Sequence, residues 1–120
     1  MILKNKDSCA KNIQELNRLL TLNLSAKQRS LIELELKSTM SGNSGEESSA
    51  YYINFRYKDS KNWAVIHDLR LEHRGLVAQI DHLLINCFLD LYVLESKNYF
   101  HGIKITEYGE FLRYNNDGKA

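Results

Sequence analysis

The fold is decided by the stretch from Trp63 to Lys97, which reads WAVIHDLRLEHRGLVAQIDHLLINCFLDLYVLESK. Three runs within it are rich in the β-branched, aromatic and other apolar residues that favour strands. These runs cover residues 63–71, 76–85 and 91–97. Connections of four and five residues separate them, and strands joined by such short connections are antiparallel neighbours. The third run opens with Leu91-Tyr92-Val93-Leu94, an unbroken apolar sequence that predicts cover on both faces of that strand.

Helical spacing dominates the residues that precede this meander. Residues 8–22 carry leucine and isoleucine three and four positions apart, which predicts a first helix. Ser25 and Gln28 form a capping-box pattern at the start of a second helix. The sequence Ser41-Gly42-Asn43-Ser44-Gly45 is rich in turn-forming residues, so it predicts a loop that ends this second helix.

A third helix is predicted from about Gly45 to Tyr57. Ala50, Ile53 and Tyr57 fall at positions i, i+3 and i+7 and form one apolar stripe. Asn54 borders that stripe and narrows it. The stripe predicts that this helix packs against the sheet.

Two features leave the orientation of the third helix open. Tyr51, Tyr52 and Phe55 form a second apolar patch on roughly the opposite side. Glu46 lies in line with Ala50, on the first stripe. If that stripe faces inward, Glu46 faces the core at the first turn of the helix. It is then either a helix-dipole or capping residue, or a member of a site.

The order of these elements predicts an α+β fold, similar to an α/β sandwich. The helices come first, and one or more of them cover a mainly antiparallel meander. A further hairpin is predicted at residues 101–106 and 110–114, around Tyr108-Gly109, before a polar C-terminal end. We expect an N-terminal helical extension at residues 1–41 and a single domain at residues 42–120.

Composition and charge narrow the classes of function. The chain has 120 residues, 43% apolar and 26% charged, which is typical of a small globular domain. A net charge of +1 argues against a general nucleic-acid-coating protein. Residues 41–120 hold nine basic and eleven acidic residues, so contact with a polyanion would need a bound cation or a basic rim. No apolar run is long enough to span a membrane, and the first residues are no secretory signal. Cys9 and Cys87 are expected to be free thiols, as in a cytoplasmic protein.

The acidic residues near the strand ends form the chemical constellation of the chain. Glu95 and Lys97 are two residues apart on the third predicted strand, so their side chains should share one face. Asp81 lies on the neighbouring strand with Gln79 on its own face, and pairing of the strands would bring Asp81 close to Glu95. Two carboxylates beside a lysine suit Mg²⁺, or Mn²⁺ in its place, which polarises a phosphate and acidifies a bound water. The alternative is an ordinary surface ion pair, which contributes little energy.

The order of several motifs resembles the nuclease-related (NERD) domain. The motifs are Gly42-Asn43-Ser44-Gly45-Glu46, Trp63-Ala64-Val65-Ile66-His67-Asp68-Leu69, Gly75, Gln79-Ile80-Asp81-His82, Glu95-Ser96-Lys97-Asn98 and Gly102. That family is placed in the PD-(D/E)xK nuclease superfamily. The resemblance therefore implies a restriction-endonuclease-like core, in which helices flank a sheet.

The resemblance also implies roles for individual residues. The implied catalytic residues are Glu46, Asp81, Glu95 and Lys97. Of these, Asp81 and Glu95 would hold the metal, and the backbone carbonyl of Ser96 is a further candidate donor. Lys97 would position the attacking water. The implied supporting residues are Gln79 and His82.

The activity that the resemblance implies is metal-dependent hydrolysis of phosphodiester bonds in DNA, during DNA processing, repair or defence. The chain departs from the family pattern between Asn86 and Asp90, where a glycine turn is usual. It also ends soon after the Glu-x-Lys strand, so we expect a core that is incomplete at its C-terminus. The alternative is a non-catalytic, nuclease-like module that binds nucleic acid or protein and keeps these acids for structural reasons.

The other chemistry-bearing residues favour structural roles. The four histidines are His67, His73, His82 and His101, and their spacing matches no zinc site. The seven tyrosines could stack on bases, but packing at half-buried positions is their commoner role. Leucines in residues 1–41 are expected to pack on the core or on a second copy of the chain, which would make the protein a homo-oligomer.

Overall fold

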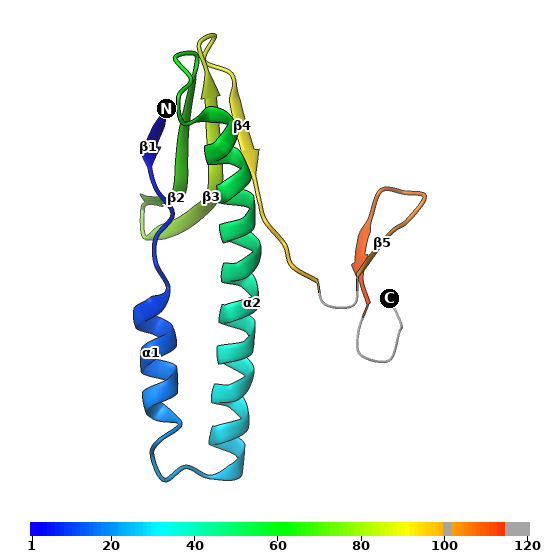
Figure 1. Cartoon of the computed structure of the whole chain (residues 1–120). Coiled ribbons are helices and arrows are strands. Elements are labelled where there is room, and N and C mark those ends of the chain that lie inside the picture. The colour runs from blue at the N-terminus through cyan, green and yellow to red at the C-terminus, as the bar shows by residue number, and fades with distance from the viewer. Residues whose placement is uncertain (100–101, 115–120) are drawn as a thin grey trace.

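The computed structural model describes residues 1–99 and 102–114 and shows one short strand, then two helices, then the other strands (Figure 1). The elements are β1 (Ile2–Lys4), α1 (Ala10–Leu19), α2 (Ala26–Tyr57), β2 (Trp63–His73), β3 (Leu76–Asn86), β4 (Leu91–Leu94), β5 (Ile103–Ile105) and β6 (Phe111–Arg113). Two helices followed by a mostly antiparallel meander confirm the predicted α+β fold. His101 and the polar end at 115–120 lie outside the described residues.

Helix α2 is continuous over 32 residues, so the predicted loop at residues 41–45 is wrong. Its start is as predicted, because Ser25 and Gln28 exchange the two hydrogen bonds of a capping box. Gly42 and Gly45 lie inside the helix. Each glycine costs about 1 kcal/mol relative to alanine in a helix interior. A penalty of that size does not end a helix that the capping box and packing on the sheet stabilise.

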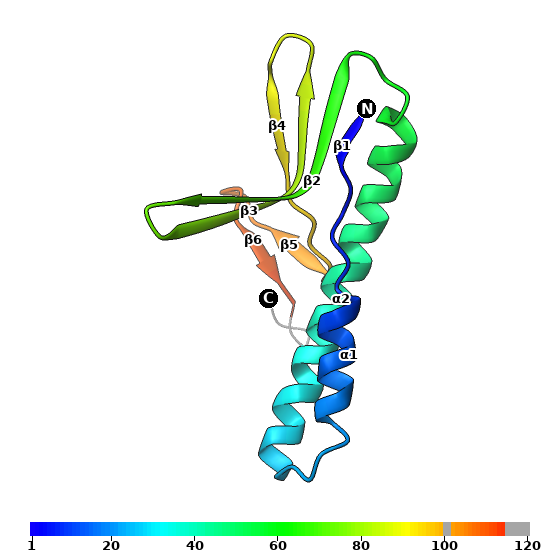
Figure 2. The same ribbon diagram turned by 90° about the vertical axis from the view of Figure 1, so that its left-hand side faces the viewer.

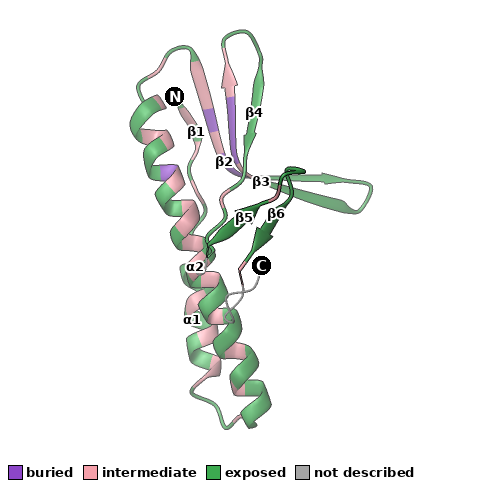
Figure 3. Cartoon of the chain, turned by 90° about the vertical axis from the view of Figure 1, so that its right-hand side faces the viewer, coloured by how far each residue is buried: buried purple, intermediate pink, exposed green. Residues whose placement is uncertain are grey.

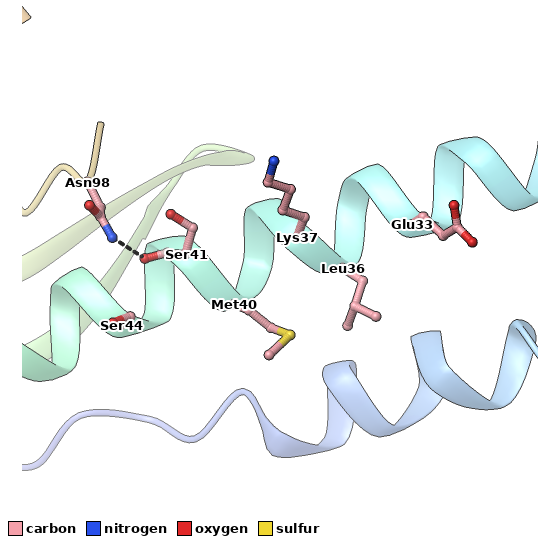
Figure 4. Close-up of a pocket in the computed structure, with 7 residues that line it drawn as sticks. All are labelled: Glu33, Leu36, Lys37, Met40, Ser41, Ser44 and Asn98. Carbon is pink, nitrogen blue, oxygen red and sulfur yellow. Dashed lines mark hydrogen bonds between the residues drawn. The ribbon is translucent and has the colours of Figure 1, made fainter. Parts of the chain in front are cut away.

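Gly45 is explained by close packing rather than by a turn. A Cβ at this position would lie 3.1 Å from the Cβ of Asn98, so the segment after β4 passes tightly over α2. Asn98 is fastened there, because its side-chain amide donates a hydrogen bond of 3.1 Å to the carbonyl oxygen of Ser41 (Figure 4). The glycine therefore allows the Glu-x-Lys segment to approach the helix.

The main sheet has the strand order β1-β2-β3-β4. Pairing of β2 with β3 and of β3 with β4 is antiparallel, as predicted. Strand β1 adds a parallel edge strand that the sequence pattern did not predict. Its three residues are too few to show a period of two, and non-local hydrogen bonds such as that from Val65 N to Met1 O, at 2.9 Å, hold it in place.

The β2–β3 hairpin closes through a two-residue turn and bends along its length. Arg74 and Gly75 have φ values of 49° and 78°, the left-handed pair that a tight hairpin turn requires. Asp68, within β2, has a φ of 50° and interrupts the regular ladder between His67 and Leu69. This conformation accounts for the bend that carries the turn away from the rest of the sheet (Figure 2).

Strand β4 differs from its prediction in length and in cover. It ends at Leu94, so Glu95 to Lys97 lie beyond the ladder. The predicted cover on both faces is wrong, because all four residues of β4 are exposed. Leu91 and Val93 are 64% and 63% exposed, and Tyr92 and Leu94 are exposed too. Among the described residues, β4 is the edge strand opposite β1, and α2 packs against β2.

The core lies between α2, β2 and β3, where Figure 3 places the buried residues. Its buried apolar side chains are Ala50, Val65, Leu83 and Leu84. Trp63 extends this core, with its ring 5.1 Å from that of Tyr57 and 5.5 Å from that of Tyr92. The Ala50 stripe of α2 is therefore the inward one. The opposite patch of Tyr51, Tyr52 and Phe55 is between 66% and 73% exposed.

The other elements extend away from this core. Helix α1 packs beside the first half of α2, and β5 and β6 form the separate hairpin predicted around Gly109 (Figure 1). The predicted division into an extension at residues 1–41 and a domain at residues 42–120 stays a prediction. Helix α2 continues across the predicted boundary without a break, and β1 belongs to the main sheet. None of the described helices combines the length and apolar character that crossing a membrane needs.

Candidate functional site

Two aspartates on neighbouring strands lie within charge range of a glutamate on the inward side of α2. The three residues are Glu46 on α2, Asp68 on β2 and Asp81 on β3. The register pairs His67 with His82 and Leu69 with Ile80, which sets Asp68 across from Asp81. We call Glu46, Asp68 and Asp81 the carboxylate cluster.

The charges of this cluster act on Glu46. Partial burial raises the pKa of the Glu46 carboxyl above its usual value, and the nearby charges of Asp81 and Asp68 raise it further. The ammonium of Lys6 opposes these effects and lowers the pKa. Asp81 and Asp68 thus repel the charge of Glu46, and a cation relieves repulsion of this kind.

Asp68 is a member of the cluster that its sequence context did not single out. Only 6% of it is exposed, and its Oδ2 accepts a hydrogen bond of 2.8 Å from the backbone N–H of Asp7. A charged residue within an apolar strand run was the available signal. Its partner lies 61 residues away, so no local pattern could reveal the contact.

Lys6 is the basic residue at the cluster and was also not anticipated. Its Nζ lies 3.6 Å from Oε2 of Glu46 and donates a hydrogen bond of 2.7 Å to Oδ1 of Asn43. It also donates to the carbonyl oxygen of Asp7 at 3.1 Å. Only 13% of the Lys6 side chain is exposed.

A buried hydrogen-bond chain crosses the molecule beside the cluster. It runs from Asn54 on α2 through His67 and His82 to Ser96, and we call it the histidine relay. The Asn54 Oδ1–His67 Nε2 distance is 2.7 Å, the two Nδ1 atoms are 2.9 Å apart, and His82 Nε2 lies 2.7 Å from Ser96 Oγ. His67 and His82 are 0% and 2% exposed.

One assignment of protons satisfies the whole relay. With Oδ1 of Asn54 facing it, His67 donates from Nε2 and accepts at Nδ1. His82 then donates from Nδ1 and accepts at Nε2 from the hydroxyl of Ser96. Both rings are neutral in this arrangement. Burial, above all, lowers the pKa of both histidines, which favours the same neutral state.

The relay and the cluster together fix the Glu-x-Lys segment. The backbone N–H of Ser96 donates to Oδ2 of Asp81 at 2.9 Å, while the Ser96 hydroxyl joins the relay. The N–H of Ser96 is thus satisfied by a side chain, two residues beyond the end of β4 at Leu94.

Glu95 and Lys97 flank Ser96, whose backbone is bonded to Asp81, and both of their side chains are exposed to solvent. They form an ion pair of 2.9 Å, with 67% and 58% of their side chains exposed. The hydrogen bond to Glu95 raises the pKa of the Lys97 ammonium. Gln79 is exposed and pairs with Arg70 on the protruding part of the hairpin.

The structure therefore assembles the predicted residues only in part. Asp81, His82 and Ser96 are in one hydrogen-bonded unit, and Glu46 lies within reach of the charge of Asp81. Throughout residues 1–99 and 102–114, no three His, Cys, Asp or Glu side chains come close enough to hold a metal ion.

A separate groove lies along α2, towards its N-terminal half. Leu36, Met40 and Asn98 are among the residues that line it (Figure 4). The carboxylate cluster takes no part in its lining, so this groove does not belong to the site.

Comparison with known proteins gives one match. Residues 41–119 match the family model of the nuclease-related domain (NERD). No curated protein and no solved structure matches the chain. The matched region contains the cluster and the relay, whereas Lys6 and Asp7 precede it.

Proposed function

This chain belongs to the nuclease-related domain family, and from that membership we propose that it is a Mg²⁺- or Mn²⁺-dependent phosphodiesterase acting on DNA. The observation that carries the proposal is the position of Asp81. It lies within charge range of Glu46 and is bonded through Ser96 to the Glu-x-Lys segment. Processing, repair or defence of DNA in the cytoplasm is the setting that we propose.

The residues at the cluster fit a hard divalent ion in their chemistry. Mg²⁺ prefers one or two carboxylates and keeps several of its waters, so it needs no cage of protein ligands. The repulsion that Asp81 adds at Glu46 is of the kind that such an ion relieves. We propose Asp81 as the central ligand and Glu95 as the second. The exposed pair of Glu95 with Lys97 is weak enough to open.

Each residue of the chain has a defined part in this proposal. A bound metal ion would neutralise charge on the phosphate and make a water more acidic. Lys97 is protonated at neutral pH, as lysines ordinarily are, and it positions the attacking water once its pair with Glu95 has opened. Glu46 tunes the charge of the site, and the relay holds Ser96 so that the segment stays beside Asp81. The carbonyl of Ser96 is a further candidate donor.

Cleavage of plasmid or single-stranded DNA tests the proposal. We expect wild-type protein to cut with Mg²⁺ or Mn²⁺, and Lys97→Ala and Asp81→Ala to lose this activity. Lys61→Ala, in an exposed turn, serves as the matched control and should cut like wild type. If wild type and Lys97→Ala give the same background, the protein is not this enzyme.

A second candidate is a non-catalytic module that binds DNA or a protein. The Glu95–Lys97 pair favours it, because both side chains are more than half exposed to solvent. DNA binding that is equal in wild type and Asp81→Ala, without any cleavage, would support this candidate. Assembly of copies through the N-terminal helices stays a prediction.

A further inference from the structure

The position of Lys6 points to a regulatory contact at the carboxylate cluster. We propose that Lys6 is a tethered cation that stays beside Glu46 and weakens the binding of a divalent ion at Asp81. The inference rests on the proposed metal site, and it assigns a role to a segment outside the matched family region.

The chain is anchored both just before and just after Lys6, which holds this residue at the cluster. Strand β1, just before it, pairs with β2, and Lys4 Nζ donates to the carbonyl oxygen of His67 at 3.0 Å. Just after it, the N–H of Asp7 donates to Oδ2 of Asp68 at 2.8 Å. Lys6 is thus held between two anchors, and its position does not depend on the long side chain alone.

The Lys6 side chain is only 13% exposed, and its ammonium is surrounded by partners of the protein. A charged group drawn out of water is costly unless such partners replace that water. Asn43 and the carbonyl of Asp7 accept its hydrogen bonds, and Glu46 supplies the opposite charge. The same charge opposes the repulsion that Asp68 and Asp81 exert on Glu46.

A divalent ion at Asp81, the proposed central ligand, would meet the positive charge of Lys6, which lies 3.6 Å from the Glu46 carboxylate. A unit charge about 6 Å from a divalent ion, in a dielectric near that of water, weakens the binding of that ion about tenfold. Removing the charge at position 6 should therefore tighten metal binding by about that factor.

This role differs from that of a lysine that lies too far from the metal to act on its charge and contacts only the substrate phosphate. Neutralising such a lysine would leave metal affinity unchanged in the absence of DNA. Metal affinity measured without DNA therefore tests the proposed role of Lys6.

Binding of Mn²⁺ to the full chain, followed by the loss of the electron paramagnetic resonance signal of the free ion, tests the proposal without any activity. Lys6→Gln keeps a donor for Asn43 but loses the charge, and Lys6→Met keeps only the stem. Both should bind Mn²⁺ about tenfold more tightly than wild type. Lys6→Arg keeps the charge and should bind like wild type, as should the control Lys11→Met on the exposed side of α1.

Two results would overturn the inference, and they can be told apart. If wild type binds Mn²⁺ and the two neutral variants bind it no more tightly, the role of Lys6 is wrong while the metal site stands. If wild type and every variant leave the signal of free Mn²⁺ unchanged, the metal site itself is wrong, and this inference fails with it. Thermal unfolding of each variant shows whether it is folded. Since Gln and Met differ in shape, one folded neutral variant suffices.

Discussion

Substitution of His67 by leucine is expected to destabilise the protein through the groups that it leaves without partners. His67 is fully buried, and both of its ring nitrogens are hydrogen-bonded, at 2.7 Å and 2.9 Å. Leucine is of similar size but offers no polar atom. The Nδ1–H of His82 and the Oδ1 of Asn54 would then remain without their present partners.

The size of the loss follows from the burial of those two groups. An unsatisfied buried donor or acceptor costs about 1–3 kcal/mol. His82 is 2% exposed and should contribute fully, whereas half-buried Asn54 can recover a bond to water. We expect His67→Leu to lower the free energy of unfolding by about 2–4 kcal/mol. For a domain of this length, that corresponds to a fall in Tm of roughly 8–16 °C.

A double-mutant cycle, measured by urea unfolding at pH 7.5, tests the reasoning. In the variant His67→Leu/His82→Leu the stranded donor is gone, so the combined loss should be smaller than the sum of the two single losses by about 1–3 kcal/mol. Additivity of the single losses within about 0.5 kcal/mol would refute the relay.

Three further outcomes follow from the same structure. The pKa values of His67 and His82 are lowered below 6.5, so the unfolded state binds more protons at mildly acidic pH. The contribution of the two neutral histidines to the free energy of unfolding should be fully present above pH 6.5. It should be lost as the pH falls from 6.5 through their lowered pKa values in the folded protein. Urea titrations that show no such pH dependence would contradict this. The pKa of Glu46 is raised above 4.5, so Glu46→Gln should stabilise the protein at neutral pH and lose this advantage below pH 4.5; equal gains at both pH values would oppose it. Gly42→Ala, in open space, should stabilise the helix by about 0.5–1 kcal/mol. Gly45→Ala should gain less, because its Cβ would press on the segment after β4; thermal melting that ranks Gly45→Ala first would contradict this contact.

The parts of the fold that local patterns describe were predictable. The capping box at Ser25 and the antiparallel meander follow from residue types at fixed spacing, and both are present. The loop at residues 41–45 was wrong because glycine there serves close packing against Asn98, a contact between distant segments. Strand β1 was missed for a related reason, since its partner β2 lies far along the chain.

The same distinction applies to the candidate site. Alignment of Glu46 with Ala50 anticipated an inward carboxylate, and strand pairing anticipated the nearness of Asp81 to the Glu-x-Lys segment. Lys6 and Asp68 reach the cluster only through tertiary packing, so no local spacing marks them. Where the Glu95 and Lys97 side chains point depends on how Ser96 is held, which a strand pattern does not contain.

Binding of a divalent metal at Asp81 is the central claim, and thermal unfolding with and without Mn²⁺ tests it most directly. A ligand that binds only the folded state stabilises it by about 2.7 kcal/mol at a concentration one hundred times its Kd. We expect Mn²⁺ to raise the Tm of wild type by roughly 10 °C under that condition. Asp81→Ala should abolish the rise, and the exposed control Asp59→Ala should keep it. An unchanged Tm in wild type, or an equal rise in Asp81→Ala, would contradict a metal site at Asp81.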